Sequence, residues 1–148
     1  MKNVAKMIVV VFMSMMLWAC QPPSVPKEVA TEIATNFINA TTSGDYEKAF
    51  TYVNAKEFFL VRPKERWVEY YDAISQELGP IVSIKLTRFQ ADDRFSGRFY
   101  TYVFSIKHEK GFTKELVTLI QQINSKADLE VFAHKIEGGK LSKINTMF

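Results

Sequence analysis

Residues 75–89 read SQELGPIVSIKLTRF, and the spacing of the apolar residues changes within this stretch. The apolar residues up to Leu78 recur at the spacing of one face of an α-helix; they are Trp67, Tyr71, Ile74 and Leu78. The Gly79-Pro80 pair is typical of a helix end, because glycine adopts the left-handed conformation there and proline cannot continue a helix. After Pro80 the apolar residues alternate with polar ones, as in a β-strand. We therefore expect helices before Gly79 and strands after it.

Two more helices are predicted upstream of this change. From Lys27 onward, two adjacent apolar rows predict a helix that ends at Gly44. Those rows are Val29, Ile33 and Phe37, and Ala30, Ala34 and Ile38. Asp45 is suited to cap a second, short helix over residues 46–53, and Pro63 suits the first turn of the third helix. We interpret residues 57–61 as a packed linker or turn between the second and third helices.

Downstream, the segments rich in Val, Ile, Thr, Phe and Tyr predict strands over residues 81–89, 98–109, 112–123 and 128–137. Turn residues separate them, Asp92-Asp93 with Ser96-Gly97 in the first connection and Lys110-Gly111 in the second. Connections this short join antiparallel strands. On the second strand, one face carries Tyr100, Tyr102, Phe104 and Ile106. The fold class predicted is therefore α+β, with three N-terminal helices packed on one face of a curved antiparallel sheet of about four strands.

The N-terminal segment differs from the rest of the chain. MKNVAK is short and positive, and Met7–Trp18 is apolar apart from Ser14. This run is shorter than the roughly 20 apolar residues of a membrane-spanning helix. Together with the small residue Ala19, it is typical of a secretory signal over residues 1–19.

The chain contains a single cysteine, Cys20, directly after this segment. LWAC, residues 17–20, resembles the bacterial lipobox, with Leu17, Ala19 and Cys20 at its three defining positions; Trp18 departs from the pattern, which prefers a small residue there. The resemblance implies that the Cys20 thiol carries a diacylglycerol and anchors the mature chain to a membrane. The alternatives are a cleaved signal followed by a free cysteine and an uncleaved N-terminal anchor.

Residues 20–26 then form a Pro-rich tether, and residues 27–148 form a single domain. Gln21, after the lipidated position, favours the outer membrane by resemblance to the sorting pattern of Gram-negative lipoproteins. We therefore expect the protein in the cell envelope, at the periplasmic face of the outer membrane. Without residues 1–19 the chain carries 17 basic and 16 acidic side chains, which gives no reason to expect nucleic acid as a partner.

The order of helices and strands resembles the cystatin-like cone of the nuclear transport factor two-like superfamily, and the uncharacterised bacterial lipoproteins that carry it. The resemblance lies in residues 34–50, 66–86, 100–120 and 128–137; Leu129 departs from it, since such families often carry a Trp there. It implies a cone with a concave pocket and a sheet face through which such cones often form homodimers. This fold occurs in enzymes, adaptors and scaffolds, so it leaves the function open.

The concave side is the candidate site, because pockets combine aromatic walls with a few polar groups. The predicted lining is Trp67, Tyr71, Tyr100, Tyr102, Phe104 and His134, with Glu115, His134 or Asp72 as sources of polarity. The same aromatic residues would equally suit a filled core. His134 shares strand alternation with Phe132 and Ile136 and is expected to point inward, whereas His108, beside a turn, is expected in solvent.

No catalytic motif, metal-ligand spacing or cofactor fingerprint is present in the sequence, so we predict neither catalytic residues nor a metal or cofactor. We expect a membrane-anchored, non-enzymatic binding or assembly accessory module whose partner is an envelope protein or a small apolar ligand. The alternative is a small enzyme, or a carrier of an apolar ligand, that uses the cone pocket.

Overall fold

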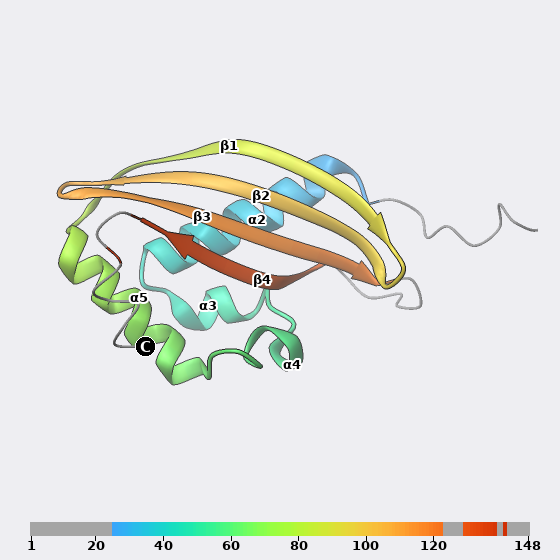
Figure 1. Ribbon diagram of the computed structural model, residues 1–148, viewed down its shortest axis with the longest axis horizontal. Coiled ribbons are helices and arrows are strands. Elements are labelled where there is room, and N and C mark those ends of the chain that lie inside the picture. The colour runs from blue at the N-terminus through green and yellow to red at the C-terminus, as the bar shows by residue number, and fades with distance from the viewer. Residues whose placement is uncertain (1–24, 123–128, 139–140, 142–148) are drawn as a thin grey trace, which may run out of the picture.

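The computed structural model describes residues 25–122, 129–138 and 141, and within them four helices precede four strands (Figure 1). The helices are α2 (Lys27–Thr42), α3 (Tyr46–Phe50), α4 (Ala55–Phe58) and α5 (Lys64–Leu78). The strands are β1 (Ile81–Arg94), β2 (Gly97–His108), β3 (Gly111–Gln122) and β4 (Glu130–Glu137). The predicted α+β class and the change from helices to strands at Gly79 are confirmed. The predicted signal and Cys20 lie outside the described residues.

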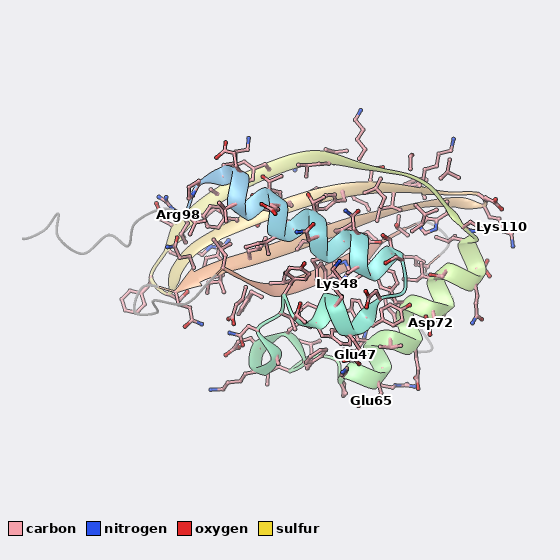
Figure 2. All side chains as sticks on the ribbon, turned by 180° about the vertical axis from the view of Figure 1, so that it is seen from behind. Glu47, Lys48, Glu65, Asp72, Arg98 and Lys110 are labelled. Carbon is pink, nitrogen blue, oxygen red and sulfur yellow. The ribbon has the colours of Figure 1, made fainter. Side chains whose placement is uncertain are left out.

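The four strands form one antiparallel sheet in the order β1-β2-β3-β4. It is curved, and α2 crosses one of its faces, in front of the sheet in Figure 2 and behind it in Figure 1. On that face Tyr102 of β2 lies opposite Val117 of β3, and Phe104 lies opposite Glu115. All four side chains are buried. The predicted inward face of the second strand is therefore confirmed.

The helix boundaries follow from the capping residues. Gly44, at φ 76°, follows α2, and the Asp45 side chain accepts a hydrogen bond from the Lys48 amide at 3.2 Å and so caps α3. This second helix ends at Phe50, earlier than predicted, because Val53 instead forms a bridge to β4. The predicted linker, residues 57–61, includes the end of α4, a short helix capped by the Asn54 side chain. None of the helices within the described ranges is long and apolar enough to cross a bilayer.

The first hairpin differs from the prediction. Asp92 and Asp93 belong to β1, which continues to Arg94, and the connection to β2 is only Phe95 and Ser96. Asp93 lies opposite Arg98, whose guanidinium donates to the two carboxylate oxygens at 2.6 and 2.7 Å. Opposite charges at facing positions of two antiparallel strands stabilise the pairing, so these acidic residues extend the strand. Figure 2 shows Arg98 at the end of the sheet where α2 begins.

The prediction that His108 is solvated is wrong: the residue is 4 % exposed. The turn after β2 folds back on the junction between α5 and β1, where the Glu109 amide donates to the Pro80 carbonyl and the Lys110 amide to the Leu78 carbonyl, both at 3.0 Å. His108 Nδ1 lies 3.1 Å from the Gly79 carbonyl oxygen, to which it donates. The turn between β2 and β3 would be exposed if the hairpin stood alone, but in the folded protein the end of α5 covers it.

A bulge in β4 changes its alternation. The register with β3 shifts between Thr118 and Leu119, so that Val131 and Ala133 have partners on β3 and Phe132 has none. Phe132 contacts Phe99, at 5.8 Å between ring centroids, whereas Val131 is fully buried in the core. Phe132 and His134 therefore do not share one face as simple alternation predicts, and the bulge leaves His134 directed inward.

Candidate functional site

A buried carboxylate lies at the centre of the cone. Glu115 on β3 is 1 % exposed, and side chains from three elements surround it. The Tyr71 hydroxyl of α5 donates to its two oxygens at 3.1 and 3.0 Å, and the Thr113 hydroxyl of β3 donates to Oε1 at 3.2 Å. His134 Nε2 of β4 lies 2.9 Å from Oε2. An ionised carboxylate only accepts hydrogen bonds, so these three donors compensate for its removal from water.

The protonation of Tyr71 fits its role as a hydrogen-bond donor to Glu115. Burial, and then the nearby charge of Glu115, raise the pKa of Tyr71 well above its ordinary value, so its phenol keeps the proton that it donates. The Thr113 hydroxyl also lies 3.4 Å from His108 Nε2. The polar groups therefore form a chain through the core, from His108 at the end of β2 to His134 on the edge strand β4.

Aromatic rings hold His134 in place. Its ring centroid lies 5.2 Å from that of Phe37, 5.8 Å from that of Trp67 and 6.1 Å from that of Tyr71. Its side chain is 0 % exposed. Nε2 faces Glu115, whereas Nδ1 is buried and has no hydrogen-bond partner among the described residues.

A pocket of about 500 Å³ lies between β4 and the α4–α5 region. Its wall includes Phe58, Trp67, Tyr70, His134 and Ile136, with the exposed Leu60 at its rim. The Arg62 guanidinium, also in the lining, lies 4.0 Å from the centroid of the Tyr70 ring. Glu115 is not part of this wall and lies behind His134. The pocket is thus aromatic, with a cation at one side, and the buried imidazole of His134 lies behind its wall.

Neither a protein-family profile nor a curated protein matches the sequence. Among solved structures, an NTF2-like protein from Cytophaga hutchinsonii superposes with a TM-score of 0.53 at 10% identity, over 78% of this chain and 99% of that one. A protein of unknown function with a cystatin-like fold, from Nostoc punctiforme, gives 0.58 at 10% identity, over 81% and 96%. The CaMKII hub of S. rosetta gives 0.51 at 12% identity, over 80% and 100%. The domain has the NTF2-like fold. At these identities the likeness shows the fold alone.

The NTF2-like cone brings together three of the six residues predicted to line a pocket. Trp67 and His134 line the pocket, and Tyr71 lies behind them against Glu115. Tyr100 and Tyr102 lie instead beneath the start of α2, where their hydroxyls donate to the carbonyls of Val25 at 3.1 Å and Lys27 at 3.4 Å.

The other candidates lie away from the pocket. Phe104 is 2 % exposed within the hydrophobic core. Asp72 is exposed on α5 and accepts a hydrogen bond from the Tyr46 hydroxyl. Of the three predicted sources of polarity, Glu115 and His134 meet in the cone and Asp72 does not.

Thr113 and the rim of the pocket were not predicted from the sequence. The alternation of β3 was available as a signal, because Thr113, Glu115 and Val117 occupy every second position and all are buried. Leu60 and Arg62 carried no such signal, since they lie in the irregular segment between two helices.

Proposed function

We propose that this chain is a lipid-anchored binding module of the cell envelope that holds a small, largely apolar ligand in the pocket between β4 and α4–α5. The pocket is the observation that carries the proposal. Small-molecule sites typically have volumes of roughly 300 to 1,000 Å³, apolar walls and a few polar groups. The volume of about 500 Å³ and the wall of Phe58, Trp67 and Tyr70 with Arg62 beside it fit that description.

The position of Glu115 favours binding over acid–base catalysis by this carboxylate. A catalytic acid or base must come within hydrogen-bond reach of the substrate. Glu115 is 1 % exposed, and Tyr71, Thr113 and His134 already donate to it. A ligand in the pocket meets the aromatic wall, and Glu115 is not among the residues that line it.

The anchor part of the proposal rests on the resemblance of residues 17–20 to a lipobox, and the start of the cone is consistent with a short tether. Val25 is fixed to the sheet, because its amide donates to Gln121 Oε1 at 3.3 Å and its carbonyl accepts from Tyr100. Four residues separate Cys20 from Val25, and the five steps of chain between them span at most about 18 Å when fully extended. A lipid on Cys20 would therefore keep the cone near the membrane and raise its local concentration around envelope partners.

The anchor is tested by Cys20→Ser in cells fed a labelled fatty acid. We expect the wild-type chain to incorporate label and to fractionate with membranes, and the variant to do neither. Incorporation of label into Cys20→Ser would contradict the anchor and leave the pocket proposal unaffected.

The pocket is tested by native mass spectrometry of the full chain extracted gently from its own membrane. We expect a reproducible small-molecule adduct that is lost in Leu60→Glu, because a charge at the rim opposes an apolar ligand. Val82→Glu is the matched control: Val82 is exposed on β1 and does not line the pocket. A protein partner in place of the small molecule, or equal retention in Leu60→Glu, would count against the proposal.

A further inference from the structure

His134 Nδ1 is a buried polar atom for which the described part of the chain offers no hydrogen-bond partner. Its side chain has no exposed surface, so water does not solvate the atom either. Native proteins satisfy the large majority of their buried polar side-chain atoms, and an exception calls for a specific explanation. A ligand group that completes the hydrogen bonding of His134 is one such explanation.

The partners of Glu115 determine what Nδ1 can offer. The hydroxyls of Tyr71 and Thr113 both donate to Glu115, so its carboxylate acts as an acceptor here. His134 Nε2 must then carry a proton to donate to the same carboxylate at 2.9 Å. In the neutral imidazole with a proton on Nε2, Nδ1 holds a lone pair and acts as an acceptor.

The same residue borders the pocket. His134 forms part of the pocket wall together with Trp67 and Phe58. Phe58 packs on Phe37 and Trp67, at 6.0 Å between ring centroids in each case, and these are two of the rings that contact His134. Phe58 also ends α4, a helix of four residues. Because the His134 side chain has no exposed surface, a ligand in the pocket reaches the imidazole only if a side chain of the wall, such as Phe58, moves.

We propose that His134 Nδ1 is the hydrogen-bond acceptor of the pocket and that it selects small aromatic or aliphatic molecules carrying a neutral donor, such as a hydroxyl group. Glu115 is a positioning residue that holds His134 in the accepting tautomer. This inference rests on the proposed function in one respect, that the pocket between β4 and α4–α5 admits a ligand.

Phenol and anisole are suitable probes, because they have similar shapes and only phenol donates a hydrogen bond. The full chain, labelled with ¹⁵N and held in lipid nanodiscs, is titrated with each compound and followed by NMR. The indole signal of Trp67 reports entry into the pocket, and the Nδ1 signal of His134 reports its hydrogen bond. Both readouts come from one sample, so partitioning of a probe into lipid affects them equally.

We expect an unprotonated Nδ1 in the free protein, and a shift of its signal with phenol but not with anisole. Phenol should also bind about fivefold more tightly than anisole, the factor that a net hydrogen bond of about 1 kcal/mol provides. His134→Phe should bind the two compounds equally. If that variant does not fold, the titrations of the wild-type protein with phenol and anisole are sufficient to test the proposal.

The outcomes separate the two proposals. A protonated Nδ1 in the free protein overturns the inference, and so does entry of both compounds, seen at Trp67, without a response at Nδ1; in either case the pocket stands as a binding site. Failure of both compounds to perturb Trp67 overturns the inference and counts against the pocket as the ligand site.

Discussion

His134 Nε2 lies 2.9 Å from Glu115 Oε2, and the two side chains are 0 % and 2 % exposed. The pair links β4, an outer strand of the sheet, to the neighbouring strand β3 within the core. Each group would be unfavourable there by itself, because a buried polar group without a partner loses its hydrogen bonds to water. The two residues are 19 positions apart in the chain, so their contact depends on the pairing of β3 with β4.

Replacement of Glu115 should strongly destabilise the fold. In Glu115→Ala the donors of Tyr71, Thr113 and His134 lose their common acceptor, and we expect the free energy of unfolding to fall by about 3–5 kcal/mol. Glu115→Gln should cost less, because its amide oxygen still accepts. Urea denaturation measures both variants.

The control for this series is Glu32→Ala, at an exposed position on α2, which should change the free energy of unfolding by no more than about 0.5 kcal/mol. A cost for Glu115→Ala as small as that of the control would show that the carboxylate does not organise the core.

Tyr71 should make stability depend on pH in the alkaline range. Its pKa is raised well above the ordinary value of 10.0, first by burial and then by Glu115, so the folded state holds the phenol proton more tightly than the unfolded state. Its contribution is fully present below about pH 10 and decreases as the pH rises towards the folded pKa. The difference in unfolding free energy between wild type and Tyr71→Phe should therefore shrink above pH 10.

Urea denaturation of the two proteins from pH 8 to about pH 11 checks this prediction. The raised pKa values of Tyr46, Tyr70 and Tyr102 are common to both proteins and do not enter the difference. A difference in unfolding free energy between the two proteins that grows with pH would contradict the prediction.

Gly97 should not tolerate alanine. It begins β2 at φ 151°, and an added Cβ would lie 2.2 Å from the carbonyl oxygen of Gln121 on β3. We expect Gly97→Ala to lower the free energy of unfolding by about 2–4 kcal/mol, from backbone strain together with the clash. Gly44→Ala is the matched control, since Gly44 has φ 76° and open space around it, and should cost about 1–2 kcal/mol. Equal costs would mean that the contact with Gln121 relaxes freely.

His108 should anchor the turn between β2 and β3. We expect His108→Ala to speed hydrogen exchange of the Lys110 amide, which donates to the Leu78 carbonyl at 3.0 Å, because the turn loses its bond to Gly79. His108→Asn retains a donor near the position of Nδ1 and should exchange more slowly than His108→Ala. Unchanged protection in both variants would assign the anchoring to the backbone bonds alone.

The main elements of the fold follow from local sequence patterns. The helical spacing of Trp67, Tyr71 and Ile74, the Gly79-Pro80 break and the alternation after it predict α5 and β1 at their observed junction. Asp45 and Pro63 act at helix starts as their side chains suggest. These features depend on residues only a few positions apart, so they can be predicted from spacing in the sequence.

The errors arise where distant segments meet. His108 stands beside a turn, and only the packing of that turn on the end of α5 buries it. The alternation of β4 places Phe132 with His134, and only its register against β3 reveals the bulge that separates them. The side chains facing the pocket from residues 57–62 have no periodic pattern from which to infer their position.

Local patterns in the sequence were enough to predict α2, α3, α5 and the four strands, the inward face of β2 and the class of the fold, but not the short helix α4. Hydrophobic periodicity and capping act over a few residues, which is why they can be recognised without the structure. Only the packed fold shows that Glu115, Tyr71, Thr113 and His134 converge, and that Nδ1 of His134 has no partner among the described residues. These residues come from three elements of the fold. Strand register and the docking of α5 against the sheet bring them within hydrogen-bond distance, and no local pattern encodes either.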